Sequence, residues 1–130
     1  MASAERQAVE LSGVPETLLW NLDHRAYEAR QARPVLDDPK AVELIERIDY
    51  PFEETFGPPD PLLAQGQALR ARTFDDAVRD FLGKHPEGTV VALAEGLETQ
   101  FWRVDNGRAH CPGGTRSTPP TACWSPLRDC

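Results

Sequence analysis

The chain has 130 residues, of which 40% are hydrophobic and 27% charged, and its formal net charge is −7. This length suits one domain of ordinary size, and the composition is that of a folded protein. The negative charge argues against nucleic acid and anionic membranes as partners. No stretch approaches the roughly 20 consecutive apolar residues of a membrane span. The N-terminus also lacks the basic start and apolar run of a secretory peptide, so we predict a cytoplasmic protein.

Two helices are predicted in the first 50 residues. The first runs from Val14 to about Gln31 and ends before Pro34. Its apolar stripe consists of Leu18, Leu19, Leu22, Ala26 and Ala29. Asp37 or Asp38 can cap the second helix, with Pro39 at its first position. The apolar face of that second helix consists of Ala41, Val42, Leu44, Ile45 and Ile48.

A turn-rich connector, residues 50–61, is expected to lead into a long helix from about Leu62 to Lys84. The side chains expected on the inner face of this helix are Leu63, Leu69, Phe74, Ala77, Val78, Phe81 and Leu82. Residues 89–94 (TVVALA) then predict a short strand that is buried on both faces, as in a parallel sheet. A turn follows over residues 95–99, and residues 100–104 are expected to begin a short helix or turn.

The order of these elements is typical of the front end of a doubly wound α/β domain. We therefore predict the α/β class, with a helical N-terminal extension followed by the first strand and cofactor-binding turn of an incomplete Rossmann-like domain. The helical region covers residues 1–86 and the start of the Rossmann-like domain covers residues 87–107. An irregular tail covers residues 108–130.

The turn after the predicted strand is the segment best suited to chemistry. Gly96 permits a close approach of the backbone to a ligand, and Glu95 and Glu98 can accept hydrogen bonds from its amino or hydroxyl groups. Acidic side chains also favour a cationic adenosyl-sulfonium ligand over a pyrophosphate, which prefers a bare helix N-terminus. From the residue pattern alone, an ordinary strand-to-helix turn is the alternative interpretation.

Three segments of the chain resemble the leucine carboxyl methyltransferase family, which includes a bacterial branch linked to polyketide O-methylation. Residues 93–99 (LAEGLET) are similar to the family's Leu-Gly-x-Gly-Leu-Asp-Thr and depart outright only at Ala94. Residues 70–76 (RARTFDD) match Arg-x-Arg-x-x-Asp-Asp, and residues 36–41 (LDDPKA) match Leu-Asp-Asp-Pro-x-Ala. The segments follow the family's order, and the likeness covers about residues 11–107.

The resemblance implies an S-adenosyl-L-methionine-dependent O-methyltransferase, whose full-length relatives methylate a carboxyl or hydroxyl group of a small molecule. It implies that Gly96 and the backbone around Glu95 border the methionine part of the cofactor, with Glu98 near the same pocket. It also implies that Arg70 or Arg72 pairs with the cofactor's carboxylate. A solvated helix face with acidic partners is the alternative for these arginines. No catalytic residue is predicted.

Other side chains give weaker indications. No C-x-x-C or H-x-x-x-H spacing is present, and no metal site is predicted. The cysteines all lie in the last twenty residues, at Cys111, Cys123 and Cys130. The aromatic side chains that can either line a pocket or pack in the core are Trp20, Tyr27 and Trp102.

The tail differs in composition from the rest of the chain. Residues 1–107 hold 20 acidic and 11 basic side chains, whereas residues 108–130 hold one acidic side chain and three arginines. The tail also contains four prolines and no Val, Ile, Phe, Glu or Lys. Such a change is typical of a shifted reading frame, and a genuine disordered tail is the alternative. We therefore expect a truncated, inactive methyltransferase fragment; a non-catalytic helical interaction module over residues 14–85 is the alternative.

Overall fold

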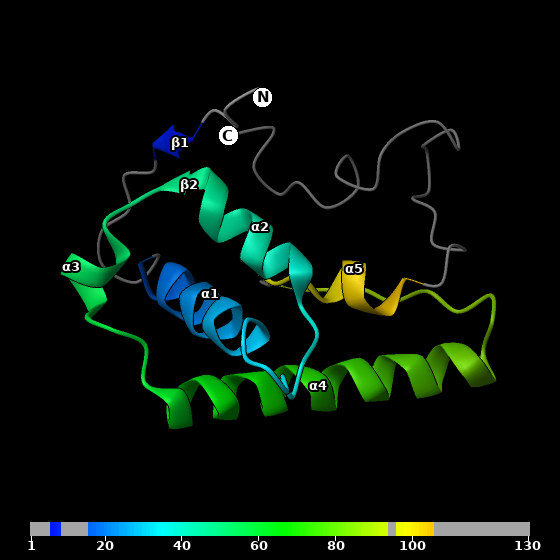
Figure 1. Cartoon of the computed structure of the whole chain (residues 1–130). Coiled ribbons are helices and arrows are strands. Elements are labelled where there is room, and N and C mark those ends of the chain that lie inside the picture. The colour runs from blue at the N-terminus through cyan, green and yellow to red at the C-terminus, as the bar shows by residue number, and fades with distance from the viewer. Residues whose placement is uncertain (1–5, 9–15, 94–95, 106–130) are drawn as a thin grey trace.

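The computed structural model describes residues 6–8, 16–93 and 96–105. Its helices are α1 (Glu16–Ala29), α2 (Pro39–Arg47), α3 (Phe52–Phe56), α4 (Pro61–Lys84) and α5 (Gln100–Val104). Two short strands, β1 (Gln7–Ala8) and β2 (Ile48–Asp49), pair in parallel, with Gln7 opposite Ile48. Helix α1 lies between α2 and α4, and α5 lies beside the C-terminal half of α4 (Figure 1).

Aspartate caps begin both α2 and α4. The Asp38 carboxylate accepts a hydrogen bond from the Ala41 amide at 3.1 Å, and the Asp60 carboxylate accepts one from the Leu63 amide at 2.9 Å. Each helix also has a proline in its first turn, where the missing N–H removes no intrahelical bond. The predictions of α1, α2, α4 and α5 are confirmed within the described residues.

The contact between α1 and α2 also follows the predicted apolar faces. Leu22 and Ala26 of α1 form a buried cluster with Ala41 of α2. The partly buried side chains that pack against this cluster are Val42, Leu44, Ile45, Ile48 and Leu97. Burial of such aliphatic side chains is the main favourable contribution to folding.

The prediction of the inner face of α4 is wrong for most of its residues, although Val78 and Leu82 are half-buried. Its buried side chains are Ala64, Ala68, Ala71 and Asp75. The large apolar side chains of Leu63, Leu69, Phe74 and Phe81 are between 40% and 58% exposed. Three alanines at i, i+4 and i+7 make a shallow strip that lets neighbouring backbone approach α4 closely. Ala68 and Ala71 pack there against Leu36, in the loop between α1 and α2, so small size rather than hydrophobicity determined the buried face.

The prediction of a buried strand is wrong for residues 89–93. These residues form no strand, and Val91 and Leu93 are 72% and 83% exposed. A parallel strand that is buried on both faces needs neighbouring strands and a layer of helices on each side. Among the described residues, the parallel sheet contains β1 and β2 alone, with two residues in each strand. Ala94, the last residue of the predicted strand, lies outside the described residues.

The short elements β1, β2 and α3 are absent from the prediction. Two-residue strands and a five-residue helix are too short to show a hydrophobic period in the sequence. Helix α3 lies inside the segment predicted as a turn-rich connector, and three aromatic rings gather around it. The Phe52 ring lies 5.0 Å from the Tyr50 ring and 6.5 Å from the Phe56 ring, measured between centroids. None of the described helices is long and apolar enough to cross a membrane.

Candidate functional site

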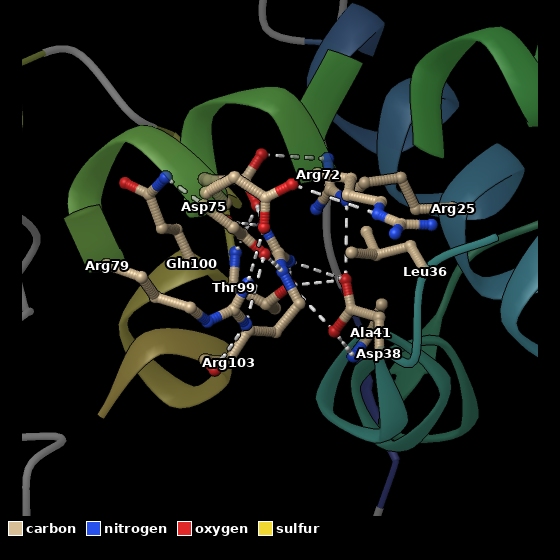
Figure 2. A network of polar contacts seen from close by, with 12 residues as sticks. Arg25, Leu36, Asp38, Ala41, Arg72, Asp75, Arg79, Thr99, Gln100 and Arg103 are labelled. Carbon is tan, nitrogen blue, oxygen red and sulfur yellow. Dashed lines mark hydrogen bonds and ion pairs between the residues drawn. The ribbon is translucent and has the colours of Figure 1, made fainter. Parts of the chain in front are cut away.

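A buried group of charged and polar side chains connects the turn after residue 95 to the helices. We call this group the Arg103 cluster; its members are Arg25, Asp38, Asp75, Glu98, Thr99 and Arg103. They come from α1, the N-terminus of α2, α4, the turn and α5. Figure 2 labels all of them except Glu98, and the labelled side chains converge. The cluster therefore joins segments that are up to 78 residues apart, as the numbers of Arg25 and Arg103 show.

Arg103 lies at the centre of the cluster, and its side chain is 3% exposed. Its guanidinium donates to three carboxylates: Nε to Asp75 at 2.7 Å, Nη1 to Asp38 at 2.7 Å, and Nη2 to Glu98 at 2.8 Å. A second bond from Nη2 to Asp75, at 3.1 Å, makes that pair bidentate. Burial by itself lowers the pKa of Arg103, but Asp75, Asp38 and Glu98 together raise it above its ordinary value, so the guanidinium stays charged.

Thr99 links the turn to the cap of α2. Its side chain is fully buried, and its hydroxyl donates to the Asp38 carboxylate at 2.6 Å while accepting from Arg103 Nη1 at 2.6 Å. Because Asp38 also caps α2 through the Ala41 amide, one carboxylate serves the helix start, the turn and the central arginine. The loss of any one partner would leave a buried polar group unpaired.

Arg25 holds the same turn from α1. Its Nη2 donates to the backbone carbonyl of Leu97 at 2.8 Å, and its Nη1 lies 3.4 Å from Glu98 Oε2. The buried Nε atom makes no hydrogen bond and lies 3.6 Å from Asp38 Oδ2. Two guanidinium groups thus face three carboxylates, and Arg79 Nη2 approaches Asp75 at 4.0 Å. Such pairing is what allows charges to be buried at all.

The backbone conformation of the turn and its closeness to α1 require a glycine at position 96. Its φ of +60° lies in the left-handed region, and a Cβ built there would lie 2.6 Å from Leu18 Cδ2. The sequence predicted a close approach of this glycine to a ligand; the neighbour in the structure is Leu18 of α1, and the approach to a ligand stays a prediction. Glu95 lies outside the described residues.

The other predicted cofactor-binding residues have different surroundings. Glu98 is 25% exposed on its side chain and is held by Arg103 and Arg25. Arg72 is 57% exposed; its Nη1 donates to the Val35 carbonyl at 3.4 Å, and its Nε lies 3.9 Å from Asp76. Arg70 is exposed. Within the described ranges, neither Arg70 nor Arg72 makes a hydrogen bond or ion pair with residues 96–99, so the structure does not gather the predicted set into one pocket. That these residues bind a cofactor remains a prediction.

Sequence reasoning missed Arg25 and Arg103. Arg25 lies between Leu22 and Ala26 of the apolar stripe of α1, and a charged side chain at such a position indicates a buried partner. Arg103 lies four residues after Thr99, which places both on one face of the short helix α5. The acidic partners belong to the three segments on which the family resemblance rests: Asp38 to residues 36–41, Asp75 to residues 70–76, and Glu98 to residues 93–99.

Comparison with known proteins agrees with the family resemblance of the three segments. The family model described as leucine carboxyl methyltransferase matches residues 19–111, a range that includes every member of the Arg103 cluster. The tetracenomycin polyketide synthesis O-methyltransferase TcmP of Streptomyces glaucescens is 40% identical over 99 residues, which are 76% of this chain and 36% of that protein. No solved structure matches the chain.

Two further relatives are S-adenosyl-L-methionine-dependent methyltransferases by name. The protein dpfgK of Gibberella zeae is 30% identical over 109 residues, covering 79% of this chain and 37% of that protein. A putative S-adenosyl-L-methionine-dependent methyltransferase of Mycolicibacterium gilvum is 33% identical over 93 residues, covering 62% of this chain and 31% of that protein. The chain therefore spans about a third of the length of the curated relatives that it matches.

Proposed function

The chain belongs to the leucine carboxyl methyltransferase family, and on that premise we propose that it forms the N-terminal part of an S-adenosyl-L-methionine-dependent O-methyltransferase with a small-molecule acceptor. The observation that carries this proposal is the Arg103 cluster, because each of the three family-like segments contributes a carboxylate to it. The cluster holds the turn at residues 96–99 against the helices, and this turn is the segment that resembles the family's cofactor-binding motif.

The proposed division of the chain follows from the same premise. Residues 1–86 are the helical N-terminal region, and residues 87–107 begin the Rossmann-like domain that relatives complete over the rest of their length. Residues 108–130, which the sequence predicts to be an irregular tail, lie outside the described residues. A helix-rich chain with a small parallel sheet is compatible with part of such a fold.

We further propose that the 130-residue polypeptide by itself transfers no methyl group. Methyl transfer depends on holding the acceptor and the sulfonium methyl close and in line, which requires a complete pocket. In this chain the predicted cofactor-binding residues that the structure describes share no pocket: Glu98 is bonded to Arg103 and lies beside Arg25, Gly96 is packed against Leu18, and Arg72 contacts Val35 and Asp76. We therefore assign no step of the reaction to residues of this chain.

A chimera tests the proposed function directly. Residues 16–105 would replace the corresponding segment of the Streptomyces glaucescens relative, and methyl transfer to that enzyme's own acceptor would be measured. We expect the chimera to be active, the chimera with Arg103→Met to be inactive, and the chimera with Arg47→Met to keep activity, because Arg47 is 59% exposed and bonds Glu43 on the surface of α2. A folded but inactive chimera would contradict the proposal. Turnover of S-adenosyl-L-methionine by the purified 130-residue chain would contradict its inactivity.

A helical interaction module is the second candidate function. It is favoured by the mutual packing of α1, α2, α4 and α5 around a polar cluster of their own. Calorimetric titration of the 130-residue chain with S-adenosylhomocysteine separates the two. Binding tighter than millimolar supports a cofactor site within this chain, whereas helical folding without binding, together with an inactive chimera, supports the module.

A further inference from the structure

A cavity of about 350 Å³ lies between α1 and the segment that contains α3. One wall is formed by Asp23 and Tyr27, which share a face of α1, and by Arg30, in the turn directly after that helix. Its opposite wall consists of Phe52, Glu53, Gly57, Pro58 and Pro59. Among the described residues, no member of the Arg103 cluster and no predicted cofactor-binding residue lines this cavity. Its volume is in the range of small-molecule sites.

Asp23 is the unusual residue of the cavity. It is 9% exposed, and within the described part of the chain it has no hydrogen bond and no ion pair. The other buried aspartates, Asp38 and Asp75, each accept hydrogen bonds from Arg103. Burial raises the pKa of Asp23, and the neighbouring His24 and Arg30 only partly oppose this effect. Among the described residues, the buried side-chain atom without a hydrogen bond is Arg25 Nε, so the Asp23 oxygens are still accessible at the cavity. Partial burial disfavours the charged form of Asp23, and a cationic ligand at these oxygens would offset that cost.

The remaining walls define the chemistry of that ligand. Arg30 does not neutralise Asp23 by contact, because its guanidinium is bonded to Glu46 at 3.3 Å on the surface. Glu53 adds a second negative charge to the lining. The rings of Tyr27 and Phe52 offer π faces, which attract organic cations, and Phe52 is held in place by the rings of Tyr50 and Phe56. Acidic and aromatic walls together favour a cation with an apolar body.

We propose that this cavity binds a small organic ammonium ion, with the ammonium group at the Asp23 carboxylate and an apolar ring or chain against Phe52 and Pro58. The proposal is independent of methyl transfer, because the lining residues have no part in the proposed cofactor turn. It also explains why α1 buries a charge that nothing in the described residues pairs.

Benzylammonium is a suitable probe, and benzoate is its matched control of opposite charge. Each would be titrated into the whole 130-residue chain while backbone amide shifts are followed by NMR. We expect benzylammonium to bind with the largest shifts in α1 and α3, and benzoate not to bind. Asp23→Asn should weaken binding by about tenfold or more, because the paired charge is lost. Asp80→Asn removes an equally charged group that is exposed and bonded to Lys84, and it should leave binding unchanged.

Absence of benzylammonium binding to the unaltered chain would overturn the proposal. Equal weakening by Asp23→Asn and Asp80→Asn would overturn it too, because the effect would then be one of net charge. A second readout is the urea midpoint. Asp23→Asn should raise this midpoint, since it removes an unpartnered buried charge. A lowered midpoint would show that the carboxylate has a structural partner, and the proposal would again fail.

Discussion

Two faces of α1 bury charged side chains with opposite results. Arg25 faces the turn, where it bonds the Leu97 carbonyl and lies beside two carboxylates of the Arg103 cluster. Asp23, two residues earlier and therefore about 200° around the helix, lines the cavity beside α3 without a partner. A buried charge thus stabilises one face of the helix and destabilises the other. The difference depends on whether the neighbouring elements supply hydrogen-bond or ion-pair partners for the buried charge, because both side chains belong to the same helix.

Loss of Arg103 should have the largest effect on stability. Arg103→Met nearly keeps the volume of the side chain but leaves the buried carboxylates of Asp38 and Asp75, and the partly buried carboxylate of Glu98, without their shared partner. The free energy of unfolding should fall by about 3–5 kcal/mol, a large part of the total for a small domain. Urea denaturation followed by circular dichroism measures this, with Arg47→Met as the control at an exposed arginine that pairs with Glu43 outside the cluster. A loss below about 1 kcal/mol would mean that the cluster is not the paired region described above.

Thr99→Val tests the polar link at the centre of the same region. The substitution keeps the shape of the side chain but removes the hydroxyl that donates to Asp38 and accepts from Arg103. We expect a loss of about 1–3 kcal/mol, since buried groups are left unsatisfied. Thr73→Val is the matched control, because the Thr73 hydroxyl is exposed and bonds only the Leu69 carbonyl among the described residues. Equal losses for the two threonines would contradict a special role for Thr99.

Gly96→Ala tests how closely the turn is held against α1. The new methyl group would meet Leu18, and the left-handed backbone would become strained, so we expect a loss of about 1–2 kcal/mol. Gly66→Ala gives the contrasting result, because no atom lies within 4 Å of the added Cβ in the middle of α4. That substitution should stabilise the chain by roughly 0.5–1 kcal/mol. The two alanines should therefore move the urea midpoint in opposite directions.

The pH dependence of Asp23 should give the smallest effect. Its pKa in the folded chain is raised above 3.8 by burial, so the folded state disfavours the charged form. The resulting loss of stability is fully present above the folded pKa and disappears as the pH falls below the unfolded value. Asp23→Asn should therefore be more stable than the unaltered chain by the largest margin at neutral pH, and this margin should disappear at acidic pH. An advantage that stays constant over this range would show that Asp23 does not titrate as proposed.

The sequence pattern was sufficient to predict the main helices and the cap of α2. Asp38 and Pro39 predicted the start of α2, and the spacing of Leu22, Ala26 and Ala41 predicted which faces of α1 and α2 meet. Capping bonds and the period of a helix involve residues three or four apart, so the information lies within one turn of the chain. The sequence also singled out Gly96, for its approach to a ligand, and the structure adds that this glycine has a left-handed backbone.

The pairing of charges, by contrast, was decided by the tertiary structure. Asp75 appeared as one of two acidic neighbours of Arg70 and Arg72, yet its partner is Arg103, 28 residues later. Close packing buries the alanine strip of α4 and leaves the larger apolar side chains of that helix exposed. Residues 89–93 form no strand, because no described strand pairs with them.

The sequence by itself determined the family, the main helices and the glycine of the turn, because motifs, caps and helical periods are properties of neighbouring residues. Only the tertiary structure decided that Asp38, Asp75 and Glu98 share one arginine while Asp23 has none. A buried carboxylate is stabilised or destabilised by atoms that arrive from distant parts of the chain, and a linear pattern does not contain their distances.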